Sequence, residues 1–246
     1  MIQSVQRAAA LLKAFDSDTP ELGVNDLSRR VGLHKSTASR LLATLEHAGL
    51  VERVPGTEKY RLGFELVRLA GYVRHYGDLR ELARPVLADL AAQTSETVHL
   101  AVLDGDEVIN LEQIEAPHML REANWVGRRT PLHCVANGKA LLAWLPDPQS
   151  AAIYAAPLAQ YTDRTITDPH LLRRQMAQVR RCGYAVALGE IEIGLHAVAA
   201  AICDRDGLPL AAVSVSGPAY RVTPQRIDAL GALVVAAATT IAGRML

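Results

Sequence analysis

The chain has few cysteines and few aromatic residues, which argues against disulfide-linked, zinc-binding and RNA-binding proteins. Its three cysteines, Cys134, Cys182 and Cys203, are an odd number and form no CxxC pair. This spacing predicts neither a disulfide framework nor a zinc site, and we expect no metal and no cofactor. Aromatic residues make up only 4% of the chain. Their scarcity disfavours an RNA-binding module, which needs exposed rings on which bases stack.

Long hydrophobic runs are also absent. We find no segment that approaches the roughly 20 apolar residues of a membrane span. The first residues, MIQSVQRAAALLKAF, have no uninterrupted apolar core of the signal-peptide type. We therefore expect a cytoplasmic protein without a membrane partner. With 246 residues, half of them hydrophobic, the chain is long enough for one or two globular domains.

Net charge is zero, but the charges are unevenly distributed. Residues 1–75 hold 11 Lys or Arg against 8 Asp or Glu, and the remainder holds 15 against 18. A mildly cationic small domain attracts DNA through counterion release, whereas an anionic domain gives no reason for a second nucleic-acid surface. The two ends of the chain are thus expected to do different things.

Residues 32–53, GLHKSTASRLLATLEHAGLVER, predict the second half of a helix-turn-helix followed by a wing. Upstream, Val24, Leu27 and Val31 form the apolar stripe of a short helix that Gly32 ends. A second helix begins near Lys35, and its apolar face carries Ala38, Leu41, Leu42 and Leu45. Its other face carries basic and hydroxyl side chains: Lys35, Ser36, Thr37, Ser39 and Arg40.

Such a face suits the major groove, where hydroxyls and an arginine reach base edges and phosphates. After this helix, residues 50–54 resemble a strand, Pro55 and Gly56 turn the chain, and residues 59–62 return as the second strand of a wing. Arg53, Lys59 and Arg61 are predicted to contact phosphate. A solvated face on an ordinary helix is the alternative interpretation, and the paired helix with its wing favours DNA.

The remaining pattern predicts an α+β protein. An amphipathic helix with Val5 on its apolar face precedes the helix-turn-helix, and a linking helix follows the wing. Beyond a helix that contains Pro85, strands 97–103 and 108–114 form a hairpin around Asp104 to Asp106. A helix begins near Asn137, and another runs from Asp168 to Gly183. The predicted domains are a winged helix-turn-helix (1–63), a linking helix (64–78) and an effector-binding domain (79–246).

Several motifs together resemble the IclR family of bacterial transcriptional regulators. They are the 32–53 segment with YRLG (60–63), then PLHCVANGKALLA, GYA and GLPLAAVSVSGPAYR. The resemblance implies an N-terminal winged helix, a linking helix that helps to pair two DNA-binding domains, and a C-terminal effector domain similar to GAF and PAS modules. It also implies action as a dimer, commonly paired again into a tetramer. The expected function is regulation of transcription, with repression favoured, by a protein whose operator affinity a small organic acid changes.

Two features predict where the effector binds. The first is the start of the helix in PLHCVANGKALLA. Backbone amides near Asn137 and Gly138 suit a carboxylate there, and a buried tight turn is the alternative interpretation. Ser214 and Ser216 are two apart on a strand and face one side, where they bond either a ligand or the backbone. The resemblance favours a ligand. It assigns effector contacts to Ala136, Asn137, Ala187, Ala197, Ser214 and Ser216, with Glu190 as the nearest match to an acidic group absent near Ala187.

Two other functions remain open. Cys134 makes a thiol-based redox sensor conceivable, since a cysteine of low pKa can switch a DNA-binding domain without a small ligand. An enzyme that uses His133 with Cys134 is disfavoured, because neighbours on an extended segment point to opposite faces. We therefore expect no catalytic residues.

Overall fold

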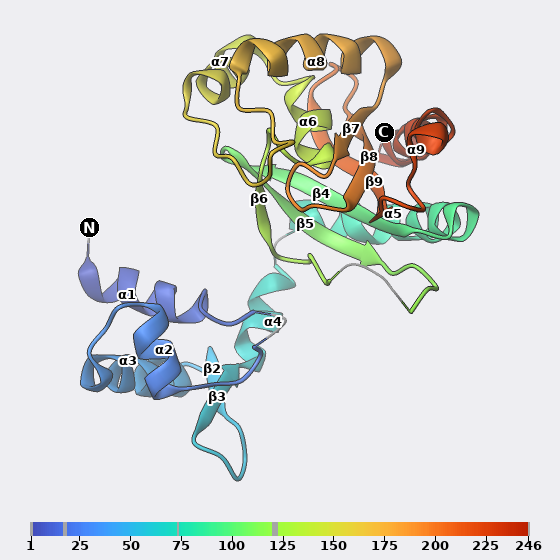
Figure 1. Cartoon of the computed structure of the whole chain (residues 1–246). Coiled ribbons are helices and arrows are strands. Elements are labelled where there is room, and N and C mark those ends of the chain that lie inside the picture. Colours follow the sequence, from blue (N-terminus) through green and yellow to red (C-terminus); the bar gives the residue numbers. More distant parts are fainter. Residues whose placement is uncertain (1, 17–18, 73, 120–122, 246) are drawn as a thin grey trace. The chain divides into compact units, whose positions relative to one another are not determined.

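The computed structural model describes residues 2–16, 19–72, 74–119 and 123–245. The chain divides into two compact units, Met1–Gly77 and Asp78–Leu246 (Figure 1). We call them the head and the body and describe each by itself. Of residues 74–77, only the backbone is described.

The head combines helices with a small antiparallel sheet. Its elements are α1 (Gln3–Leu12), β1 (Leu22–Gly23), α2 (Val24–Arg30), α3 (Lys35–His47), β2 (Val51–Arg53), β3 (Lys59–Leu62) and α4 (Phe64–Ala70). The strand order is β1-β3-β2. Wholly buried Leu11, Leu27 and Leu42 centre the core. Gly32 follows α2 with a φ of +65°, which confirms the turn predicted there.

The structure differs from the sequence prediction in three parts of the head. Strand β1 was not predicted, because two residues are too short for a recognisable pattern. On α1 the wholly buried residue is Leu11, and Val5 is exposed. The linking helix predicted over 64–78 is wrong in its bounds: α4 ends at Ala70, and α5 (Arg74–Thr94) is a separate helix that contains Gly77. A glycine inside a helix costs only about 1 kcal/mol, which packing of the same helix offsets.

The body is a six-stranded antiparallel sheet with helices on both faces. Its strands are β4 (Thr97–Asp104), β5 (Glu107–Ile114), β6 (Arg129–Pro131), β7 (Ala185–Leu188), β8 (Leu195–Cys203) and β9 (Pro209–Pro218), in the order β6-β5-β4-β9-β8-β7. Helices α5 and α9 (Ile227–Met245), the latter preceded by the 3₁₀ turn η1 (Pro224–Arg226), cover one face. Helices α6 (Ala136–Leu142), α7 (Asp147–Ala155) and α8 (Pro169–Cys182) cover the other.

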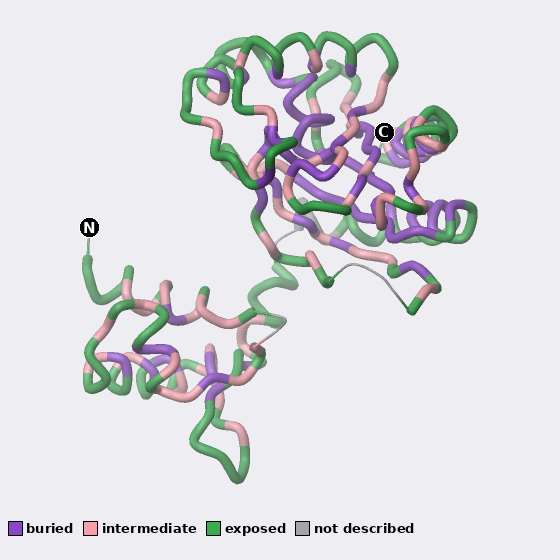
Figure 2. The backbone as a smooth tube through the Cα atoms, in the orientation of Figure 1, coloured by how far each residue is buried: buried purple, intermediate pink, exposed green. Residues whose placement is uncertain are grey.

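This arrangement confirms the predicted α+β class. The sheet lies between the two helical layers, so its central strands are largely buried (Figure 2). Turn and capping residues in the sequence predict several of these elements. Gly105 turns the β4–β5 hairpin with a φ of +68°. The Asp168 carboxylate accepts the backbone N–H of His170 at 2.7 Å and so caps α8, which Gly183 ends with a φ of +84°.

The last helix corrects one expectation. Among the described residues, the stretch Pro224–Met245 is long and apolar enough to cross a membrane, judged by length and composition alone. A core helix of a globular domain meets the same criterion. Here Val234, Ala238 and Ile241 are buried against the sheet.

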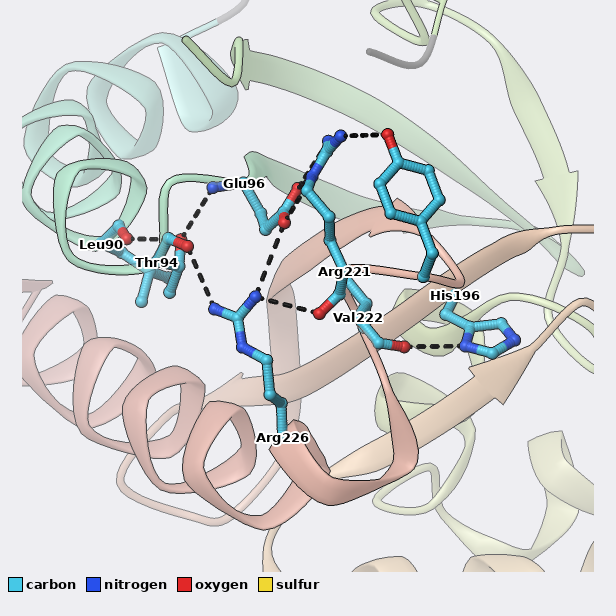
Figure 3. A network of polar contacts seen from close by, with 8 residues as sticks. Leu90, Thr94, Glu96, His196, Arg221, Val222 and Arg226 are labelled. Carbon is cyan, nitrogen blue, oxygen red and sulfur yellow. Dashed lines mark hydrogen bonds and ion pairs between the residues drawn. The ribbon is translucent and has the colours of Figure 1, made fainter. Parts of the chain in front are cut away.

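A polar network joins the end of α5 to the segment between β9 and α9 (Figure 3). The Glu96 side chain is 1% exposed and accepts hydrogen bonds from Arg221 Nε at 2.8 Å and Nη2 at 2.9 Å. Arg226 donates to the carbonyls of Arg221 at 3.0 Å and Thr94 at 3.2 Å. A Cβ on Gly217 would lie 2.5 Å from Glu96 Oε2. Glycine at 217 therefore leaves the room that this carboxylate occupies.

Candidate functional site

The exposed face of α3 carries the residues predicted to read DNA. Ala38, Leu42 and Leu45 turn inward. Among the predicted residues, Lys35, Ser36, Ser39 and Arg40 are exposed and Thr37 is half-buried. Sequence reasoning missed His34, the N-cap of α3, whose Nδ1 lies 2.8 Å from Ser36 Oγ. Histidine is not among the preferred N-cap residues, so the pattern held no signal for it.

The wing consists of β2, β3 and the turn at Pro55 and Gly56. Arg53 lies 3.3 Å from the Glu46 carboxylate, and its guanidinium carbon is 5.2 Å from the centre of the Tyr60 ring. Arg61 Nε donates to Glu52 at 2.6 Å. Both pairs are exposed, and such pairs contribute at most about 1 kcal/mol. The arginines can therefore exchange their carboxylate partners for phosphate, and exposed Lys59 lies between them in sequence.

A pocket lies in the body, on the face of the sheet that α6 covers. It is lined by His99, Asn110, Trp125, Thr130, Val135, Ala136, Asn137, Ala187, Glu190, Ile191, Leu195, Ala197, Ser214 and Ser216. Its volume is about 60 Å³, several times the roughly 10–15 Å³ that one water molecule needs. The pocket has room for a small ligand.

Seven of the eight residues predicted to bind an effector line this one pocket: Ala136, Asn137, Ala187, Glu190, Ala197, Ser214 and Ser216. Gly138 does not. A Cβ on Gly138 would lie 2.5 Å from both Cα and O of Leu132. This glycine lets α6 pack against the preceding segment, so its position is explained by packing.

Polar groups converge on the pocket from several elements. His99 Nε2 on β4 lies 3.1 Å from Ser216 Oγ on β9. Asn137 Nδ2 on α6 donates to Asn110 Oδ1 on β5 at 3.4 Å. Among the described residues, Asn137 Oδ1 and Trp125 Nε1 are buried without a hydrogen-bond partner. Buried polar atoms are rarely left unpaired, so these two offer an acceptor and a donor to a bound molecule.

A buried ion pair supports one wall. Lys139 on α6 is wholly buried, and its Nζ lies 2.5 and 2.6 Å from the two carboxylate oxygens of Glu190. Nζ also donates to the carbonyl of Val186 at 3.3 Å. Burial lowers the pKa of Lys139, and Glu190 opposes that shift. Glu190 lines the pocket, whereas Lys139 lies behind it.

The loop that carries Glu190 is held from a second side. The hydroxyl of Thr162 donates to the carbonyl of Gly189 at 2.6 Å, and that of Thr165 donates to the carbonyl of Glu190 at 2.6 Å. The pocket wall is therefore fixed both through its side chain and through its backbone. In the part of the chain that the structure describes, no three His, Cys, Asp or Glu side chains are grouped as metal ligands.

Cys134 is not a reactive thiol in this structure. It is wholly buried, and burial, with a contribution from Glu190, raises the pKa of its thiol to about 12. A sensing cysteine needs a lowered pKa and solvent access. Its neighbour His133 places Nε2 2.9 Å from the carbonyl of Ala159. Nothing in this geometry supports the redox alternative.

The head, with its basic, hydroxyl-bearing α3 and a hairpin wing, defines a winged helix-turn-helix DNA-binding protein. Comparison with family models then identifies the family. The IclR helix-turn-helix domain matches residues 4–55, and the bacterial transcriptional regulator IclR C-terminal domain matches residues 71–243. The chain belongs to the IclR family of bacterial transcriptional regulators.

Individual relatives agree. The HTH-type transcriptional regulator XynR of Escherichia coli is 36% identical over 223 residues, 90% of this chain and 88% of the relative. The transcriptional repressor IclR of the same organism is 32% identical over 98% of this chain and 89% of its own. An IclR homolog from Microbacterium hydrocarbonoxydans, solved in complex with 4-hydroxybenzoate, is 29% identical, covers 99% of each chain and has a TM-score of 0.87. These relatives are regulators and not enzymes, and this chain is a DNA-binding transcriptional regulator.

The burial of Cys134 leads to a first prediction. In native protein at about pH 7.5, iodoacetamide should modify exposed Cys182 and leave Cys134 unmodified, because a buried thiol of raised pKa supplies almost no thiolate. Peptide mass spectrometry over a time course measures both sites. Unfolding in urea should make the two cysteines equally reactive. Modification of Cys134 before Cys182, with loss of DNA binding, would instead favour a redox sensor.

Proposed function

We propose that the chain is a ligand-responsive regulator in which a small organic acid, bound in the body pocket, changes the affinity of paired heads for a two-fold symmetric operator. The observation that carries this proposal is the meeting of predicted effector residues from α6, β7, β8 and β9 around one cavity. Residues 1–63 are assigned to DNA binding and residues 79–246 to the effector. Repression in the cytoplasm is the favoured mode, by analogy with relatives named as repressors.

The chemistry of the pocket supports a small acid. Ser214, Ser216 and the Trp125 N–H are hydrogen-bond donors, and donors suit a carboxylate. Ala187 and Ala197 leave room for an apolar skeleton and make a hydrocarbon lining. The 4-hydroxybenzoate complex of the Microbacterium homolog shows that a relative holds an aromatic acid.

The DNA contacts can be tested by two substitutions in the head. Arg40→Ala should weaken binding to the specific operator by about 1 to 3 kcal/mol, because it removes a base contact. Lys59→Ala should weaken all sequences more evenly and reduce the salt dependence. Fluorescence anisotropy measures both affinities over a salt series. The two duplexes are the intergenic DNA upstream of the protein's own gene and a random sequence.

Arg180→Ala, an exposed arginine on α8 in the body, is the matched control and should leave both affinities unchanged. Equal loss on specific and random DNA in Arg40→Ala would refute the base-reading role.

The effector class can be tested by calorimetry with a panel of aliphatic and aromatic monocarboxylic acids that includes 4-hydroxybenzoate. One acid should bind and shift operator affinity. Ser214→Ala and Asn137→Ala should each weaken that acid by about 10- to 100-fold, the effect of one lost hydrogen bond to a charged group.

Ser150→Ala is the control for that experiment. Ser150 is buried on α7 and hydrogen-bonds the carbonyl of Asp147, away from the pocket lining. No binding by any acid, or equal loss in Ser150→Ala, would contradict the assignment.

Exposed apolar side chains on the head support the proposal of self-association. On α4, Phe64 is 77% and Val67 is 62% exposed, and on α1 Val5 is 62% exposed. Large apolar side chains exposed on a small domain are typical of an interaction surface. We infer that two copies pair through α4, in a dimer or a dimer of dimers.

Substituting Phe64→Ser should raise the dissociation constant of the dimer by about 10- to 100-fold, because the buried ring contributes about 1.5 to 3 kcal/mol. Sedimentation velocity measures this and also separates dimers from tetramers. Leu208→Ser, which changes an exposed apolar residue of the body, should have no effect. An unchanged association state in Phe64→Ser would rule out pairing through α4.

A further inference from the structure

The lining of the pocket holds an anionic side chain and, among its described residues, neither lysine nor arginine. The anion is Glu190. Lys139, its partner, lies behind the wall with Nζ engaged by both Glu190 oxygens and the Val186 carbonyl. The Lys139–Glu190 pair has no net charge, and a carboxylate that enters the pocket faces Glu190, the negative residue of the pair. Burying an uncompensated carboxylate costs several kcal/mol, so the bound acid needs another positive charge.

His99 is the titratable base in the wall. It is 4% exposed on β4, directly opposite Ser214 on β9, and opposite residues of an antiparallel pair share a face. On its other side β5 presents Gln113, which is neutral. Among the described residues, the charged groups around the pocket are Glu190 from the loop after β7, Lys139 from α6, and Arg128, whose guanidinium carbon is 5.5 Å from the Trp125 ring centre.

The contact between His99 and Ser216 lets a protonated His99 interact with a ligand through the Ser216 hydroxyl. A protonated imidazole donates from both nitrogens. Its Nε2–H then donates to Ser216 Oγ, 3.1 Å away, and the Ser216 hydroxyl can donate its own hydrogen to a ligand. Ser216 lines the pocket beside Ser214. The Ser216 hydroxyl thus links the imidazolium to the ligand through two successive hydrogen bonds.

We propose that the acid effector binds together with one proton, taken from solvent and held on His99, so that the complex gains no net charge. This inference rests on the acid-binding function proposed above and assigns His99 as the counter-charge of the carboxylate. Since the complex then holds one proton more than the free protein and free acid, raising the pH weakens binding. Where His99 is neutral in the free protein and one proton is taken up on binding, the dissociation constant should rise about tenfold per pH unit.

Calorimetry on the full chain tests this, with 4-hydroxybenzoate and the tightest acid of the panel as probes. Titrations at about pH 8 in phosphate and in Tris, whose ionisation enthalpies differ, give the number of protons taken up. The expected number is close to one. His99→Gln keeps an amide donor but cannot titrate, so uptake should fall to about zero and the pH dependence should disappear.

His196→Gln is the matched control. His196 is also buried, does not line the pocket, and places Nδ1 2.8 Å from the carbonyl of Val222. That variant should retain the uptake. The amide 4-hydroxybenzamide supplies a test on unmodified protein, because a neutral ligand should bind without a proton even if a variant fails to fold.

The outcomes separate the two proposals. Binding of an acid without proton uptake would overturn the role of His99 and leave the acid-sensing function standing. Uptake that persists in His99→Gln would place the proton on another group and overturn the inference. Failure of every acid to bind would overturn the effector class and this inference with it.

Discussion

The buried pair of Lys139 and Glu190 is the interaction on which the pocket depends. It joins α6 to the loop after β7, with the Val186 carbonyl as a third partner. Removal of one member would leave a buried charge without compensation, which typically costs about 3 to 5 kcal/mol. Because Lys139 is wholly buried and fully hydrogen-bonded, the Glu190 carboxylate keeps one position in the wall. The pocket is thereby shaped before a ligand enters.

A second buried acid holds the opposite side of the sheet. Glu96 binds Arg221 next to Gly217, one residue after Ser216 on β9 (Figure 3). Successive residues of a strand face opposite sides, so β9 carries a pocket hydroxyl on one face and packs against this carboxylate on the other. Neither side of β9 has room to move without disturbing a buried polar contact. The effector proposed to bind at Ser216 would therefore act on a strand that is restrained from both sides, and closely packed elements transmit discrete changes better than loose ones.

The parts of the fold that could be predicted from the sequence are those with a local cause. Gly32, Gly105 and Gly183 have positive φ values at turns, and the side chain of Asp168 caps α8; each leaves a mark within a few residues. Short strands such as β1 and β6 leave none, because two or three residues set no period. Pocket residues were predictable where a family motif marks them, as at Ser214. His99, Trp125 and Lys139 escaped prediction because only the antiparallel sheet and the packing of α6 bring these distant residues together.

The proposed function requires that the acid favour one arrangement of the heads, because a ligand with equal affinity for two states shifts neither. The head supplies a weak starting point for such control. Arg53 and Arg61 already have carboxylate partners in exposed pairs, so DNA gains from them only the difference between phosphate and carboxylate. If two heads pair as proposed, modest contacts in each head make affinity depend on engaging two half-sites at once. Under the proposed mechanism, a small change in how the heads are paired would be enough to release the operator, without any change within α3 itself.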